Sequence, residues 1–239
     1  MRRILVTGGS RGIGLEFVRQ YLKRGDRVFA ASRKPEDSSE LQQLTGEYGE
    51  QLSVLQLDVS SEKSRSAVFE RIAAKTDTLD ILINNAGIAS GNEKVRYQFG
   101  ELNQEDLSRS FLVNTIAPLM MTQEFFPMLE KGNDTIVVNI SSNSGCISLK
   151  RGNGSTGYGY SSAKAALNMI TKMLSIQLKD HSITVVSLHP GWVRTTMLYC
   201  DNAPLEPLES ISGMIRVIDS LELKDTGSFL DWKGNELPW

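Results

Sequence analysis

The feature that most limits what this chain can fold into is the alternation of seven short apolar segments with amphipathic ones. The apolar segments are RILVT, RVFAAS, LSVLQLDV, DILINNAG, DTIVVNIS, ITVVSLHPG and the weaker GSFLDW. Helical patterns between and after them include residues 13–23, 62–74, 105–129, 161–178 and 208–221. Such alternation favours a parallel sheet with helices on both faces, because its strands are buried on both sides. The predicted fold is α/β: a single doubly wound Rossmann-type domain over residues 1–239, with a parallel seven-stranded sheet flanked by helices.

Charge balance and sparse cysteines exclude several classes of function. The formal net charge is -2 with acids and bases interspersed, so we expect no nucleic-acid partner and no membrane partner. Cys146 and Cys200 lack metal-ligand spacing and there are only two histidines, so we expect no metal and a reducing compartment. No apolar run approaches the roughly 18 residues of a membrane span. The first strand pattern begins almost at Met1, which leaves no room for a signal peptide, and we expect a cytoplasmic protein.

The segment TGGSRGIG joins the first strand pattern to the first helical pattern. Its glycines let the backbone turn sharply and approach a pyrophosphate, whose charge a helix N-terminus would meet. The spacing G-xxx-G-x-G differs from G-x-G-x-x-G, and glycines in a turn also fit a purely structural role. The candidate phosphate contacts are Gly8, Ser10, Arg11, Gly12, Ile13 and Gly14.

Four motifs, in this order, resemble those of the short-chain dehydrogenase/reductase family. They are the glycine segment, NNAG after the fourth strand pattern, YSSAK with Tyr160 and Lys164 one helical turn apart, and HPG after the sixth. The resemblance covers residues 3 to about 196 and is strongest to the C-factor and sniffer-type carbonyl reductases, through APLEPLESISGMIRVIDSL and FLDWKGNELPW. It implies hydride transfer between a nicotinamide cofactor and a small-molecule carbonyl.

Carbonyl reduction also needs a proton donor, which we predict to be Tyr160. A free tyrosine has a pKa of about 10, and the Lys164 ammonium, helped by an oxidised nicotinamide ring, would favour the phenolate and lower that pKa. Tyr158 is the alternative, but the residue four positions after it is Ser162. Taken alone, the spacing also fits a tyrosine and a lysine on a helix surface with no function.

The catalytic serine and asparagine follow from the resemblance. Ser142 would hydrogen-bond the substrate carbonyl; Ser141 and Ser144 compete, since a one-residue shift turns a strand side chain to the other face. Asn114 matches the family asparagine that holds a proton-relaying water. Pro118 has no N–H, so the Asn114 carbonyl would lose its helical partner and could hold that water; a kink without function is the alternative.

The cofactor is predicted to be NADP(H). An NAD site usually carries an acid after the second strand, but RVFAASRKPE has none before Glu36, and Arg33 and Arg11 could both reach a 2′-phosphate. An ordinary solvated basic turn is the alternative. By resemblance, the remaining cofactor contacts are Asp58 at the adenine, Val59, Asn85, Ala86, Gly87, Tyr160, Lys164, Pro190, Gly191, Val193 and Thr195.

These residues predict an NADPH-dependent reductase of aldehydes and ketones; the alternative is a cofactor-binding regulatory or signalling protein with little turnover. The connection MLYCDNAPLEP is too short for a helical lid, so we expect an open site that accepts aromatic or bulky carbonyls. Its expected walls are Trp192, Met197, Leu198, Tyr199 and the loop insertion 150–159, which could alternatively replace the lid and restore selectivity.

The patterns at 105–129 and 161–178 carry apolar residues on more than one face, which favours burial on two sides. In the second, Ala163, Leu167, Ile170 and Leu174 stand beside Ala166, Met169 and Met173. We therefore expect a homodimer or a homotetramer assembled through these helices.

Overall fold

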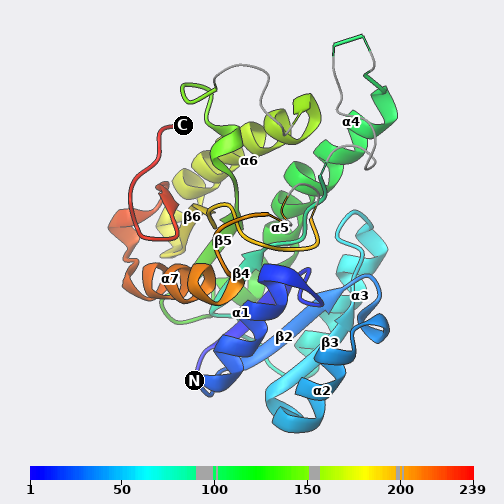
Figure 1. The fold of residues 1–239 in the computed structure, drawn as a ribbon. Coiled ribbons are helices and arrows are strands. Elements are labelled where there is room, and N and C mark those ends of the chain that lie inside the picture. The colour runs from blue at the N-terminus through cyan, green and yellow to red at the C-terminus, as the bar shows by residue number, and fades with distance from the viewer. Residues whose placement is uncertain (90–98, 101, 151–156, 198–199, 201) are drawn as a thin grey trace.

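The computed structural model describes residues 1–89, 99–100, 102–150, 157–197, 200 and 202–239 (Figure 1). One parallel sheet of seven strands has the order β3-β2-β1-β4-β5-β6-β7, which confirms the predicted fold class. The strands are β1 (Arg3–Thr7), β2 (Arg27–Ser32), β3 (Leu52–Gln56), β4 (Ile81–Asn84), β5 (Ile136–Ile140), β6 (Thr184–His189) and β7 (Phe229–Asp231).

Helices cover both faces of this sheet, as the apolar strands require. One face packs against α1 (Gly12–Lys23), α2 (Ser39–Tyr48) and α7 (Pro207–Ser220), and Figure 1 shows α1 and α7 side by side in front of the strands. The other face packs against α3 (Glu62–Ala73), α5 (Ala117–Leu129) and α6 (Gly157–Gln177). A further helix, α4 (Gln104–Phe111), runs into α5 through a π-helical turn at Leu112–Ile116. None of the described helices is both long and apolar enough to cross a bilayer.

Two elements differ from the sequence prediction. No helix was predicted at α2, because only two apolar residues, Leu41 and Leu44, form its buried stripe. The N-terminus of α2 is capped by Ser38, whose hydroxyl accepts a hydrogen bond from the Leu41 N–H. α6 begins at Gly157, whereas the predicted start was Ser161. The prediction started late because the first turn of α6 contains two glycines, which have low helix propensity. The end of the predicted 150–159 insertion is therefore helix, while residues 151–156 lie outside the described part of the chain.

The strand order reverses between β1 and β4, and ligands of such sheets bind at the carboxyl ends of the strands at this point. Asn85 joins the two strand ends: its Nδ2 donates to the Thr7 carbonyl at 2.8 Å, and its backbone N–H donates to Thr7 Oγ1 at 3.0 Å. TGGSRGIG and NNAG therefore lie against each other at the carboxyl ends of β1 and β4.

Candidate active site

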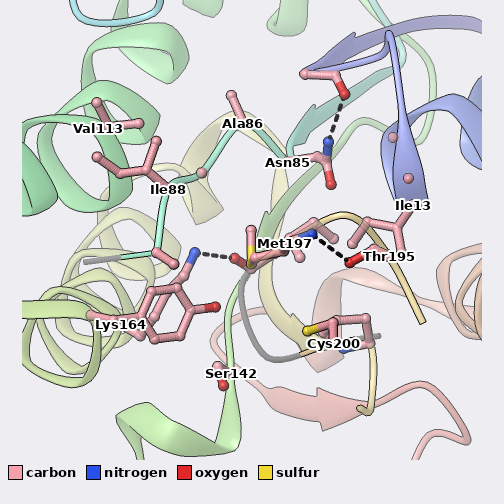
Figure 2. Close-up of a pocket in the computed structure, with 18 of the residues that line it drawn as sticks. Ile13, Asn85, Ala86, Ile88, Val113, Ser142, Lys164, Thr195, Met197 and Cys200 are labelled. Atoms are coloured by element: carbon pink, nitrogen blue, oxygen red, sulfur yellow. Dashed lines mark hydrogen bonds between the residues drawn. The ribbon is translucent and has the colours of Figure 1, made fainter. Parts of the chain in front are cut away.

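A cleft of about 2490 Å³ opens at this switch point, and Figure 2 shows residues that line it. That volume exceeds the roughly 300–1,000 Å³ of a single small-ligand pocket, so it can hold a dinucleotide together with a substrate. Every residue predicted to contact the cofactor lines the cleft, and so do Ser142, Tyr160 and Lys164. In Figure 2, Lys164 lies on the opposite side of the view from Ile13 and Thr195.

The glycine segment forms a cradle that only glycines permit. A Cβ on Gly14 would lie 2.2 Å from the Gly8 carbonyl oxygen and 2.4 Å from Asn85 Nδ2. Gly12, at a φ of +55°, starts α1, and Thr195 lies just above it, with Cγ2 3.5 Å from where a Gly12 Cβ would be. Backbone N–H groups at a helix N-terminus and a side-chain hydroxyl suit a diphosphate group.

The far end of the cleft, after β2 and β3, is basic. Arg11 and Arg33 are exposed there and form no ion pair within the described residues, whereas Lys34 pairs with Asp37 at 3.9 Å. Asp58 accepts two hydrogen bonds from Ser60, at 2.6 and 3.0 Å, and these, with Arg33 nearby, hold its carboxyl pKa below the ordinary value. This end can therefore recognise a phosphorylated adenosine.

Ser32, the last residue of β2, was not among the predicted cofactor contacts. Its hydroxyl is buried, lines the cleft, and has no hydrogen-bond partner within the described residues. A buried hydroxyl without a partner is costly, so a ligand phosphate oxygen would satisfy it. Its place at the carboxyl end of a parallel strand, beside Arg33, is the signal that could have identified it.

Burial governs the pKa values of the tyrosine and the lysine. Lys164 is 5% exposed, its Nζ donates to the Ile140 carbonyl at 2.7 Å, and burial lowers its pKa to about 8. Burial raises the pKa of Tyr160 to about 12, while a hydrogen bond with Ser142 acts in the lowering direction. Within the protein itself desolvation dominates the tyrosine pKa, and the Lys164 ammonium donates to the Ile140 carbonyl. The lowering expected from the ammonium together with an oxidised nicotinamide ring stays a prediction.

The two neighbouring serines take different orientations. Ser142 faces the cleft, where its Oγ accepts from the Ser144 N–H at 3.1 Å and lies within hydrogen-bonding reach of Tyr160. Ser141 points to the other side and donates to Asn168 Oδ1 at 2.6 Å. Ser144 also lines the cleft. Ser142 is therefore the serine that the fold brings to Tyr160.

Asn114 lies behind the cleft wall rather than in it. Its fully buried amide clamps the backbone of Ile88, accepting from the N–H at 3.0 Å and donating to the carbonyl at 2.9 Å. The helical irregularity expected near Pro118 takes the form of the π-helical turn, a device frequent at functional sites. A Cβ on Gly87 would lie 3.1 Å from Asn114 Oδ1 and 4.0 Å from Lys164 Nζ, so the amide and the ammonium flank this glycine.

Comparison with known proteins agrees with this geometry. The family described as short chain dehydrogenase matches residues 2–204. The chain belongs to this family. Over its full length this short-chain dehydrogenase is similar to the structure of an NADPH-bound carbonyl reductase from chicken fatty liver, with 36% identity, 99% of that chain covered and a TM-score of 0.92.

Two further relatives support the resemblance to the sniffer and C-factor groups. The carbonyl reductase Sniffer of D. melanogaster has 30% identity and a TM-score of 0.91, with both chains fully covered at 100%. The C-signal of Myxococcus xanthus is 37% identical across 69% of this chain and 95% of its own length. The predicted family is thereby confirmed.

The substrate side of this short-chain dehydrogenase is apolar and open. Ile147, Tyr158, Trp192 and Met197 line the cleft with exposed side chains, while the predicted wall residues Leu198 and Tyr199 lie outside the described residues. Two contacts join the chain just before Met197 to the chain that leads into α7. The Arg194 N–H donates to the Leu205 carbonyl at 2.8 Å, and the Arg194 side chain pairs with Glu206 at 2.8 Å.

Proposed function

We propose that residues 1–239 form one catalytic domain that reduces aldehyde and ketone carbonyls to alcohols with NADPH. The observation that carries this proposal is the meeting of Tyr160, Ser142 and Lys164 at the apolar end of a cleft whose other end is a glycine cradle with a basic rim. The glycine cradle and the unpartnered Ser32 hydroxyl fit a dinucleotide phosphorylated on its ribose. Cys146 and Cys200, the two cysteines of the sequence, are not joined in a disulfide, which suits the reducing cytoplasm.

The chain's own residues would handle the proton and the carbonyl oxygen. Bound NADPH supplies the hydride that reaches the carbonyl carbon. Ser142 donates a hydrogen bond to the substrate oxygen and orients it, and the Tyr160 hydroxyl donates the proton that completes the alcohol. Lys164, with a pKa of about 8, remains mostly protonated at neutral pH and opposes the negative charge left on Tyr160.

The substrate class follows from the cleft. Apolar, exposed side chains at its mouth favour aromatic or bulky carbonyls, and apolar contacts discriminate by only about 1–3 kcal/mol each. We therefore propose broad specificity. Oxidation of NADPH with a panel of aldehydes and ketones tests the function and its breadth together. A preference of several orders of magnitude for one carbonyl, erased by shortening residues 151–156, would show that the insertion acts as a lid.

The similarity to C-signal favours a second candidate, a cofactor-binding signalling protein with little turnover. A protein of that kind has no need of a proton donor held beside a lysine and a serine. The same panel separates the two: tight NADPH binding without turnover of any carbonyl would support signalling, and turnover would support the reductase.

A further inference from the structure

Two polar pairs join β5 to α6 directly beneath the proposed catalytic residues. Asn139 Nδ2 donates to Thr171 Oγ1 at 2.9 Å, and two residues later Ser141 Oγ donates to Asn168 Oδ1 at 2.6 Å. All four side chains are buried. Asn139 belongs to β5 and Ser141 directly follows the strand, so two residues apart in extended chain they point to the same side. The strand and the helix are therefore held together by directional bonds where sheet–helix contacts are usually apolar.

The upper pair, Ser141–Asn168, lies next to the active site along both elements. Asn168 is one helical turn after Lys164, and Ser141 immediately precedes Ser142. On the other side of Ser142, the chain presses on α6 again: a Cβ on Gly145 would lie 2.7 Å from the Lys164 carbonyl carbon. Ser142 is thus held between two contacts with the helix that carries Tyr160 and Lys164.

The upper pair stabilises the core less than a well-packed apolar pair would. Asn168 Nδ2 is buried without a hydrogen-bond partner within the described residues, a cost that an apolar side chain would not carry. Replacing both members of a buried hydrogen-bonded pair by apolar groups of similar shape can be nearly neutral for stability. Apolar contacts have no preferred direction, whereas a hydrogen bond does. The 2.6 Å bond therefore defines the position of Ser141 along α6.

We propose that Asn168 is a positioning residue: through Ser141 it sets the place of Ser142 relative to Tyr160 and Lys164. This role rests on the proposed reductase function. It predicts that the bond matters far more for the chemical step than for cofactor binding, because most predicted cofactor contacts, among them the glycine cradle and Arg33, lie on other elements.

The test uses Ser141→Ala, Asn168→Leu and the double variant in the full chain. Asn168→Leu leaves the Ser141 hydroxyl buried without its acceptor, so its Tm should fall; the double variant should recover most of that Tm. If Asn168 positions Ser142, the double variant will still show kcat for carbonyl reduction at least 10-fold below the unmodified protein, with the NADPH Kd within about two-fold.

Thr171→Val is the control, since it removes the β5–α6 bond farther from Lys164, together with the bonds of the Thr171 hydroxyl to Ser187 and to the Leu167 carbonyl. It should lower Tm while changing kcat less than three-fold. A double variant with both normal Tm and normal kcat would overturn the positioning role alone. Absence of carbonyl turnover in the unmodified protein would instead overturn the proposed function, and the positioning role with it.

Discussion

Tyr160 and Lys164 share one buried environment, and burial moves their pKa values in opposite directions, to about 12 and about 8. Burial removes water from both groups and so disfavours the phenolate of Tyr160 and the ammonium of Lys164. At neutral pH the tyrosine therefore carries the proton that the proposed reduction requires. Three predictions concern single residues.

Tyr160→Phe should abolish carbonyl reduction while NADPH binding survives, because only the hydroxyl is lost. We expect kcat to fall at least about 100-fold, in the range that a general acid contributes. Tyr158→Phe is the control: Tyr158 is 51% exposed at the cleft mouth and should retain most activity. Steady-state rates and NADPH fluorescence titration measure both quantities. A larger loss in the Tyr158 variant would reassign the proton donor.

Lys164→Met should raise stability at neutral pH while removing activity. The pKa of Lys164 is lowered from 10.5 to about 8, so between these values the unfolded chain keeps a proton that the folded protein has lost, and wild-type stability rises with pH. Below pH 8 the cost of burying the ammonium is fully present, so the variant should be more stable by roughly 3 kcal/mol.

Above pH 8 this difference should shrink and nearly vanish by pH 10.5. Urea unfolding of both proteins across this range measures it. Lys172→Met, at an exposed position of α6, provides the control and should show no such trend. A stability difference between Lys164→Met and wild type that does not depend on pH would contradict the assignment.

Arg33→Asp should reverse or sharply narrow a preference for NADPH over NADH. The variant replaces a cation that has no ion pair within the described residues with a charge that repels a 2′-phosphate and can accept from ribose hydroxyls. Lys34→Asp makes the same charge change at the next residue, where the native side chain already pairs with Asp37, and should alter the ratio less. Equal Kd values for the two cofactors in the unmodified protein would refute the preference.

Among the helices and strands, a glycine cannot be replaced where another segment packs so closely that a Cβ atom would collide with it. Gly14 lies against Gly8 and Asn85, so β1, β4 and α1 meet only if residue 14 has no side chain. Gly46, inside α2, has no atom within 4 Å of a Cβ built on it. Composition alone does not separate these two glycines.

Gly14→Ala should therefore abolish cofactor binding and lower Tm, because the added methyl would collide with backbone that cannot move freely. Gly46→Ala should instead stabilise the protein by about 0.5–1 kcal/mol, since alanine favours the helix and meets no neighbour. Thermal unfolding with and without NADPH checks both. Loss of stability in Gly46→Ala would mean that α2 is not helical there.

At the scale of the whole molecule, α6 has two apolar faces with different surroundings. Ala163, Leu167 and Leu174 are buried, whereas Met169, Met173 and Ile176 are 63%, 54% and 67% exposed and repeat at helical spacing. Leu112 and Ile116, in the π-helical turn that packs beside α6, are also exposed. An apolar surface of this kind favours association with a second copy.

We predict a homodimer, or a homotetramer built from it, that buries this face of α6. Met169→Glu combined with Met173→Glu should yield a folded monomer by light scattering at micromolar concentration, because two carboxylates would face the partner's apolar surface. Leu208→Glu, at an equally exposed position on α7, should leave the assembly unchanged. A monomeric unmodified protein would contradict the prediction.

The seven strands, the flanking helices apart from α2, and the motifs of the cleft follow from the sequence alone, because strand–helix alternation and short glycine, NNAG and YSSAK segments are local patterns. Which serine reaches Tyr160 is known only from the folded chain, since it depends on how Ser141 meets Asn168 across two segments. The tertiary structure also revealed the unpartnered Ser32 hydroxyl and the burial that raises the pKa of Tyr160. Orientation, burial and desolvation arise from contacts between distant segments, and no local pattern specifies them.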